Sequence, residues 1–216
     1  MLLAAVGIGV LGWWFGVQKL AVLKVRPDYG IYPAGSKIAD EHALGGFGPC
    51  GNFPRNLAEQ DWGEAGTVSL VAFPDEAAPG RLAGFVVRLI NRTESAVGFA
   101  ACDSCLFLRQ EALDRKGNWR AIELPPRAIC GNSFHRVFLA HNQYWEFAAR
   151  RYSGTFKTRI RFRVEQGETR QLDMGSGAND DEKVPILLPT RGGRLIHSNE
   201  FEGWINETLF TDDTSE

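Results

Sequence analysis

The sequence predicts a mainly β protein, an antiparallel β-sandwich of the immunoglobulin-like class that follows a single N-terminal transmembrane helix. Three features predict this fold. Residues 2–17 contain no charged side chain. About eight segments after residue 66 show the two-residue periodicity of short strands, and 24 glycines and 10 prolines supply turns between them.

The bulk composition fits one anchor segment and one folded domain. The chain has 216 residues, of which 44% are hydrophobic and 23% are charged, and this is enough to bury a substantial core. The formal net charge is only -2, so no overall field attracts a nucleic acid or an acidic surface. The composition therefore excludes a strongly basic nucleic-acid-binding protein.

The N-terminal segment, residues 1–26, is expected to be an uncleaved membrane anchor. Its apolar run from residue 2 to residue 23 has the roughly 20 residues that a helix needs to cross a bilayer. Lys19 is expected to reach the interface, and Trp13 and Trp14 are interface-seeking rings. A cleaved signal peptide is the first alternative, although no Lys or Arg precedes the run. A buried core helix is the second.

The sequence gives opposing indications of the side of the membrane on which the body lies. Lys19, Lys24 and Arg26 follow the apolar run, and positively charged flanks usually stay in the cytoplasm. The four cysteines favour an oxidising compartment instead. We expect a periplasmic or extracellular body, with the cytoplasmic side as the alternative.

The body divides into an irregular connecting arm over residues 27–66, a β-sandwich over residues 67–210 and an acidic tail over residues 211–216. Glycine, proline, asparagine and aspartate are frequent in the arm. One more strand and a helical turn are expected between residues 194 and 210. The other expected strands span residues 67–73, 81–90, 96–101, 106–113, 119–124, 134–139, 144–149 and 155–164.

The last of these strands places a row of positive charge on one face of a sheet. Four cations alternate with apolar residues or threonine from residue 156 to residue 164. A solvated sheet face is one interpretation, and no nucleic acid is expected there because no aromatic side chain is interleaved. The functional interpretation is a contact surface for lipid headgroups or an acidic partner, made by Arg150, Arg151, Lys157, Arg159, Arg161 and Arg163.

Four cysteines, Cys50, Cys102, Cys105 and Cys130, are the main candidates for chemistry. An even number in a strand-rich body behind an apolar N-terminus suits two disulfides, and three pairings are open. Buried free thiols are an alternative. A thioredoxin-like role for the C-x-x-C of Cys102 and Cys105 is rejected, because strand-like flanking residues provide no helix N-terminus to lower a thiol pKa.

A metal site is the competing hypothesis for these cysteines. Zinc is held by four ligands and often by a C-x-x-C half-site, so Cys102, Cys105, Cys130 and His135 form a candidate set for Zn or Cu. Cys50 is left over in this arrangement. The primary expectation is that the protein holds no cofactor.

Several short motifs follow one another between residues 80 and 165. They are an N-x-(T/S) turn at Asn91–Thr93, a strand cysteine at Cys102 or Cys105, a D-x-x-G-x-W hairpin at Asp114–Trp119 and a closing aromatic strand at Gly154–Phe162. This layout resembles a loose group of exported bacterial immunoglobulin-like β-sandwich proteins of unknown function. The resemblance implies a fold and no activity, and no catalytic residue is carried over.

No catalytic motif is present in the sequence. The chain lacks a G-x-S-x-G elbow, a phosphate-binding loop, H-E-x-x-H and a dinucleotide fingerprint, and its carboxylates are dispersed. We therefore expect no enzyme and no small-molecule substrate. The expected function is a membrane-anchored structural or interaction protein, an accessory subunit that contacts lipid and stabilises an assembly of integral membrane proteins. A metal-binding or metal-delivering module is the alternative.

Overall fold

A computed structural model describes residues 27–43, 45–58, 62–80, 84–126, 131–167, 169–175, 183–189 and 193–211, with backbone alone for residues 131, 169–175 and 183–189. The predicted anchor, with Trp13, Trp14 and Lys19, lies outside the described residues, as does Cys130. Within the described ranges, no helix is long and apolar enough to cross a membrane.

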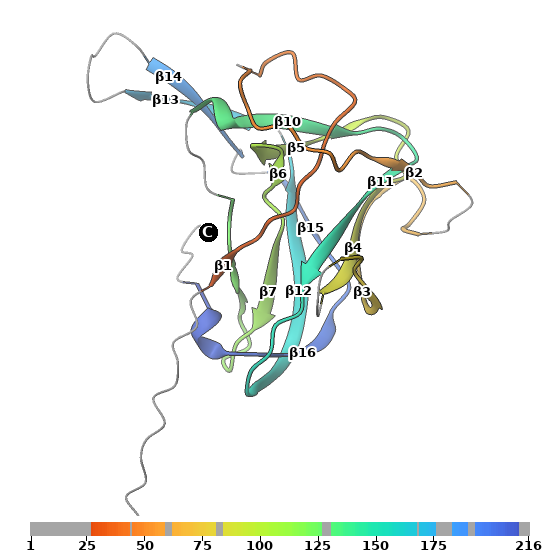
Figure 1. Cartoon of the computed structure of the whole chain (residues 1–216), viewed down its shortest axis with the longest axis vertical. Coiled ribbons are helices and arrows are strands. Elements are labelled where there is room, and N and C mark those ends of the chain that lie inside the picture. The colour runs from red at the N-terminus through yellow and green to blue at the C-terminus, as the bar shows by residue number, and fades with distance from the viewer. Residues whose placement is uncertain are drawn as a thin grey trace, which may run out of the picture.

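The larger of two main sheets has eight strands (Figure 1). Its central path runs through β10 (Phe134–Leu139), β5 (Val97–Cys102), β12 (Phe156–Gln166), β7 (Arg109–Leu113) and β8 (Trp119–Ala121). The short strand β6 (Cys105–Leu106) pairs with β5. The C-terminal strands β15 (Arg194–His197) and β16 (Phe201–Ile205) both pair with β12.

The second sheet has four strands in the order β2 (Arg55–Asn56), β11 (Gln143–Arg150), β4 (Gly84–Asn91) and β3 (Val68–Ala77). All pairings in both main sheets are antiparallel. Two small pairs complete the described strands. These are the parallel pair β1 (Asp28–Tyr29) with β9 (Glu123–Leu124) and the hairpin of β13 (Thr169–Gly175) and β14 (Lys183–Pro189).

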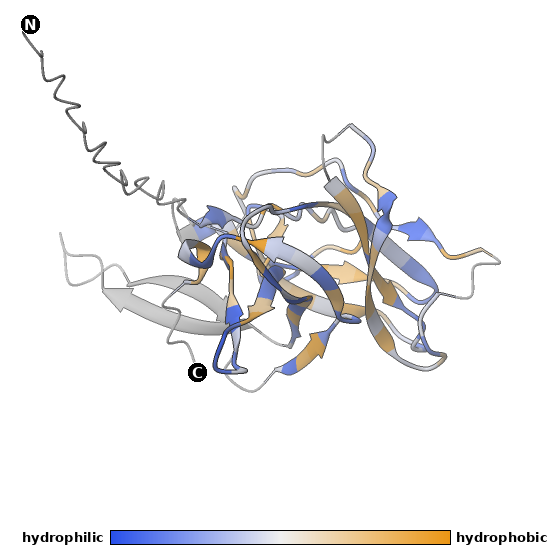
Figure 2. Cartoon of the chain, turned by 90° about the horizontal axis from the view of Figure 1, so that it is seen from below, coloured by the Kyte–Doolittle hydropathy of each residue, from blue (hydrophilic) through white to orange (hydrophobic). Residues whose placement is uncertain are grey.

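A single large hydrophobic cluster takes side chains from both main sheets. Val87 and Leu89 of β4 and Phe99 of β5 are fully buried in it, as are Trp145 of β11 and Phe162 of β12. Figure 2 shows hydrophobic and hydrophilic segments alternating along the strands, as expected when one face of each sheet is buried. The prediction of a mainly β protein with antiparallel sheets is therefore confirmed.

Strand β12 shows how sequence pattern fixes the register. Ile160, Phe162 and Val164 are buried, whereas the cations between them are at least partly exposed. A slip of one residue would exchange the two faces and bury the cations, so the alternation specifies one register. The strand therefore places its positive row on the outer face of the larger sheet.

The regular structure differs from the expectation in several places, and the strand expected over residues 119–124 is one of them, because it is divided into β8 and β9. The segment expected as one strand over residues 106–113 is divided between β6 and β7, because Phe107 and Leu108 lie outside both strands. The hairpin of β13 and β14 was not expected. The C-terminal segment forms two strands instead of one, and the expected helical turn is the short 3-10 helix η2 (Glu207–Leu209). A second short 3-10 helix, η1 (Gly131–Ser133), precedes β10.

Candidate functional site

The connecting arm between residues 27 and 58, residue 44 excepted, packs into the body of the protein and is called the arm below. Tyr32 and Ala34 belong to the main core cluster, where the ring of Tyr32 meets Phe147 and Phe162 edge to face. The indole Nε1 of Trp145 donates to the carbonyl oxygen of Gly35 at 2.9 Å. The arm is therefore a built-in part of the core and not a loose tether.

The arm also covers the outer edge of β10, and it does so with side chains. The Asp40 carboxylate accepts the backbone N–H of Arg136 at 2.8 Å, and the Ser36 hydroxyl accepts that of Phe138 at 3.1 Å. An exposed strand edge is a template for pairing with another chain. Ser36 and Asp40 therefore protect the edge of β10 without forming a strand themselves.

The Asp40 carboxylate is held in place twice by Arg136. In addition to its backbone N–H, the guanidinium of Arg136 pairs with Asp40 at 2.9 Å. Burial alone would raise the pKa of Asp40, but the hydrogen bonds from Arg136 and His42 outweigh burial and lower this pKa. Asp40 is therefore a charged anchor whose negative charge is already neutralised by a neighbour.

The C-x-x-C of Cys102 and Cys105 forms a tight hairpin turn that is hydrogen-bonded to the arm. Asp103 and Ser104, at its tip, both have positive φ angles, 47° and 57°. The Asp103 carboxylate accepts the backbone N–H of Gly48 at 2.9 Å, and the Ser104 hydroxyl donates to the carbonyl oxygen of Gly48 at 2.8 Å. Two non-glycine residues in this conformation store strain, and the strained turn binds both polar groups of one arm residue.

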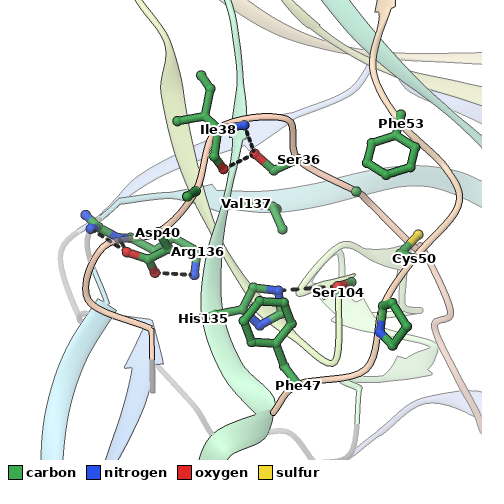
Figure 3. A pocket seen from close by; sticks show the side chains of 13 residues that line it. Ser36, Ile38, Asp40, Phe47, Cys50, Phe53, Ser104, His135, Arg136 and Val137 are labelled. Atoms are coloured by element: carbon green, nitrogen blue, oxygen red, sulfur yellow. Dashed lines mark hydrogen bonds and ion pairs between the residues drawn. The ribbon is translucent and has the colours of Figure 1, made fainter. Parts of the chain in front are cut away.

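A pocket of about 220 Å³ remains where the arm crosses the end of β10 (Figure 3). Its walls are largely apolar. Figure 3 shows His135 and Phe47 at one end, Ser104 beside them, and Ser36, Ile38 and Phe53 on the opposite side. The residues that line it are Gly35, Ser36, Ile38, Ala39, Asp40, Phe47, Pro49, Cys50, Phe53, Ser104, His135, Arg136 and Val137.

His135 is the main polar group of this pocket. Its side chain is almost fully buried, and its ring stacks on Phe47 with a centroid distance of 3.7 Å. Nδ1 lies 3.2 Å from the carbonyl oxygen of Ser133, and Nε2 lies 3.4 Å from the Ser104 hydroxyl. Burial lowers the pKa of His135 despite the hydrogen bond to Ser133, so the ring is neutral near pH 7.

The described cysteines do not form the predicted disulfide framework. Cys50 and Cys105 are free thiols, and no disulfide joins the cysteines within the described residues. Cys105 lies opposite the buried Cys102 in the hairpin. Burial raises the pKa of the Cys105 thiol, and nearby Cys50 and Asp103 add to this rise, so the thiol is less reactive than usual.

The predicted metal ligands do not converge as far as the structure describes them. Cys102 pairs with Phe134 in the sheet register, whereas His135 pairs with the core residue Ala101. Successive residues of a strand point to opposite faces, so Cys102 and His135 lie on opposite faces of the sheet. No three metal-ligating side chains come together among the described residues.

Each member of the predicted cationic contact surface has a partner within the protein. Arg161 and Arg163 pair with the buried carboxylate of Glu111, and Arg161 also lies 4.2 Å from the ring centre of Trp119. These pairs reduce the field that the row offers to lipid or to an acidic protein. The other contacts are Lys157 with Glu202, Arg159 with Glu200, Arg150 with Asp28, and Arg151 with the carbonyl oxygen of Pro74.

A buried carboxylate holds the start of the arm, and the sequence analysis missed it. Glu123 is 3% exposed and accepts hydrogen bonds from the hydroxyls of Tyr32 and Tyr152 and from two N–H groups of Gln110. Burial raises the pKa of Glu123 even though these four donors favour the charged form. Glutamate next to an alternating strand gives no sign of burial, and its partners are distant in sequence.

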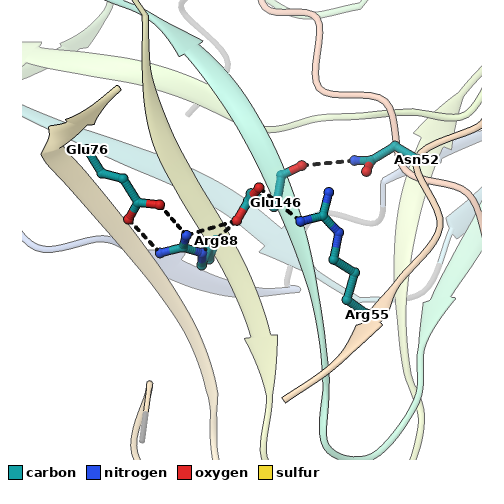
Figure 4. Close-up of polar contacts among 5 residues, drawn as sticks. All are labelled: Asn52, Arg55, Glu76, Arg88 and Glu146. Atoms are coloured by element: carbon teal, nitrogen blue, oxygen red, sulfur yellow. Dashed lines mark hydrogen bonds and ion pairs between the residues drawn. The ribbon is translucent and has the colours of Figure 1, made fainter. Parts of the chain in front are cut away.

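The outer face of the four-stranded sheet carries a second buried charge, Arg88 (Figure 4). Its guanidinium lies between Glu76, at 2.5 Å, and Glu146, at 2.9 Å, and 4.0 Å from the ring centre of Trp62. Glu146 also pairs with the exposed Arg55 of β2 at 3.1 Å. This network ties β2, near the end of the arm, to the other strands of the four-stranded sheet.

Most of the exposed large hydrophobic side chains among the described residues belong to the arm. Six such side chains are found among the described residues, and four of them lie between residues 29 and 53: Tyr29, Ile31, Ile38 and Phe53. The other two are Leu195 and Trp204. Ile38 and Phe53 both border the pocket of His135.

No protein-family model matches this chain, and no curated protein or solved structure matches it either.

Proposed function

We propose that this protein is a non-enzymatic interaction domain that uses its arm to bind a partner at a membrane. The observation that carries the proposal is the concentration of exposed apolar side chains on the arm. Ile31 is 60% exposed and Phe53 is 48% exposed, although the polypeptide around them is firmly anchored. Ile38 and Phe53 border the same pocket, and exposed large apolar side chains that lie together mark a protein or membrane contact.

The anchoring of the arm suits it to binding. Asn52 donates to the carbonyl oxygens of Pro33 and Glu146, and Gly48 is held from both sides by the hairpin turn. A surface that is ordered before binding loses little conformational entropy on association. The arm therefore presents Ile38 and Phe53 in a fixed arrangement.

The membrane part of the proposal rests on the sequence. Residues 1–26 act as an uncleaved anchor, the body is an immunoglobulin-like sandwich on the periplasmic or extracellular side, and the protein serves as an accessory subunit of an assembly of integral membrane proteins. Two facing antiparallel sheets support the sandwich assignment. The cations on β12 remain at least partly exposed, so the proposal places them next to lipid headgroups, with a field that their internal ion pairs weaken.

The hydrogen bonding of His135 supports a role outside catalysis. Ser104 is the hydroxyl nearest to Nε2, but it donates its proton to the carbonyl oxygen of Gly48 at the shorter distance of 2.8 Å. A serine nucleophile needs its proton to point at a general base. Ser104 and His135 therefore do not form a nucleophile–base pair.

Purification from native membranes in mild detergent tests the proposal. We expect the full chain to be recovered in a large stoichiometric complex, and we expect Ile38→Glu and Phe53→Glu to be recovered largely without it. Leu195→Glu is the matched control, because Leu195 is also 48% exposed but lies on β15. Recovery of the unaltered chain as a lone monomer would contradict the proposal, as would loss of the complex in the control alone.

A further inference from the structure

The Nε2 atom of His135 has one polar contact among the described residues, and that contact, with the Ser104 hydroxyl, is long at 3.4 Å. The carbonyl oxygen of Ser133 can only accept, so the proton of the neutral ring is on Nδ1. Nε2 then carries a lone pair. Ser104 has one hydroxyl proton, and the 2.8 Å bond to Gly48 uses it in preference to the 3.4 Å contact with Nε2. No other donor to Nε2 is found among the described residues.

The surroundings of this acceptor are apolar and aromatic. Phe47 stacks on the imidazole, and the pocket above it is bordered by Ile38, Phe53 and Val137. Its volume of about 220 Å³ is smaller than the roughly 300–1,000 Å³ of sites for drug-sized ligands. The pocket therefore fits one side chain better than a small-molecule substrate.

We propose that this pocket receives the indole of a tryptophan side chain from the partner protein, with the indole N–H donating to Nε2 of His135. The inference rests on the proposed function, because it names the chemistry of the partner group that the arm surface binds. Tryptophan is enriched among the few residues that dominate binding at interfaces, where it fills desolvated pockets.

The chemistry of the pocket distinguishes indole from other side chains. A phenylalanine would fill the apolar space but would leave Nε2 without a donor. A tyrosine hydroxyl donates but also brings oxygen lone pairs, whereas indole N–H is a donor only and matches a site that offers one acceptor. A lysine or arginine finds no free negative charge, because Asp40 is already paired with Arg136.

Two probes of the same shape test the inference on the full chain in detergent. Indole carries the N–H, and benzofuran has an oxygen in its place. We expect indole to bind about tenfold more tightly than benzofuran, the difference made by one buried hydrogen bond. Binding is followed by NMR through the amide signals of Ser36 and Arg136 and the imidazole ¹⁵N signals of His135, where a proton donated to Nε2 gives a characteristic shift.

The variant His135→Phe keeps a ring for stacking on Phe47 and removes Nε2. We expect it to bind the two probes with equal affinity. If this variant fails to fold, the comparison of the two probes on the unaltered chain still decides. Equal affinity of the probes on the unaltered chain would overturn the inference, as would binding that leaves the His135 signals unchanged.

Failure of this inference and failure of the proposed function are distinguishable. Weak, equal binding of both probes combined with loss of the complex in Phe53→Glu would refute the indole pocket and leave the arm surface in place. Selective indole binding combined with an unaltered chain that purifies alone would support the pocket chemistry and refute the accessory-subunit role.

Discussion

Replacement of Glu123 by glutamine is expected to change how stability depends on pH. The carboxylate is buried, accepts four hydrogen bonds and has no cation among its hydrogen-bond partners. Because burial raises its pKa in the folded state, the folded chain binds a proton more readily than the unfolded chain. The stability that Glu123 contributes is therefore fully present below the unfolded pKa of about 4.3 and is lost as pH rises through the raised folded pKa.

The structure sets the size of the effect. Between the unfolded and folded pKa values of Glu123, the stability of the unaltered chain relative to Glu123→Gln should fall by up to about 1.4 kcal/mol for each pH unit. The variant also suffers a constant loss. Its amide nitrogen faces the Nε2 donor of Gln110, and one unsatisfied buried donor costs about 1–3 kcal/mol at every pH. The test is therefore how the difference in unfolding free energy between the two proteins changes with pH, and not the size of that difference at any one pH.

Urea unfolding from pH 4 to pH 8 measures this difference. The two neighbouring hydroxyls, Tyr32 and Tyr152, have pKa values raised above 10 by burial and by Glu123, so they do not titrate in this range. Glu202→Gln serves as the control, because Glu202 lies exposed on β16 and pairs with Lys157. Parallel stability curves for the unaltered chain and Glu123→Gln would refute the assignment of a raised pKa.

Three further predictions concern the arm, its pocket and the outer sheet face. Asp40→Ala removes the acceptor of the Arg136 backbone N–H, so we expect the free energy of unfolding measured in urea to fall by about 1–3 kcal/mol and the Arg136 amide to exchange faster. An unchanged exchange rate would contradict the protection of the β10 edge by Asp40. Burial lowers the pKa of His135, so the stability that this side chain contributes is present above about pH 6.5 and is lost as pH falls. His135→Phe should remove this loss of stability in acid. An unchanged dependence of stability on pH in the variant would refute the lowered pKa. Arg88→Met should lower the free energy of unfolding in urea, by less than the roughly 3–5 kcal/mol expected for a fully buried ion pair, because Glu76 is half exposed. Arg55→Met should lower it by less than about 1 kcal/mol, because Arg55 is exposed. Equal losses in the two arginine variants would show that burial does not decide the effect.

The strands were predictable because their side chains carry the pattern of the sheet faces. The segment expected over residues 134–139 is β10 with the same bounds, and the segment expected over residues 144–149 is β11, which is one residue longer at each end. Alternation of period two requires only local information, since each residue shows directly whether it faces core or solvent. The hairpin of β13 and β14 was missed because an acidic stretch interrupts the apolar pattern between its strands.

The candidate site was less predictable, because its contacts join residues that are far apart in sequence. Asp40 and Arg136 are 96 residues apart, and Tyr32 and Glu123 are 91 residues apart. The sequence singled out His135, but as a metal ligand beside Cys102. The strand register places Cys102 and His135 on opposite faces of the sheet, and the sequence does not show where the arm crosses.

The positive row on β12 shows why charge patterning alone is a weak guide to binding surfaces. The sequence revealed four regularly spaced cations, but it did not show that Glu200 and Glu202 would return beside them on the C-terminal segment. Glu111, on the adjacent strand β7, is opposite Arg161 in the register. A row of like charges on one strand is usually balanced by its neighbours, because like charges directly opposite one another destabilise a sheet.

Polar anchors and apolar exposure on the arm have a common physical basis. An irregular segment cannot satisfy its backbone groups through strand pairing, so side chains such as Asp103, Ser104 and Asn52 supply the missing hydrogen bonds. These directional bonds fix the path of the chain without requiring its apolar side chains to turn inward. Ile38 and Phe53 therefore stay exposed on a rigid support, which is the combination that lets a small surface bind tightly without ordering itself first.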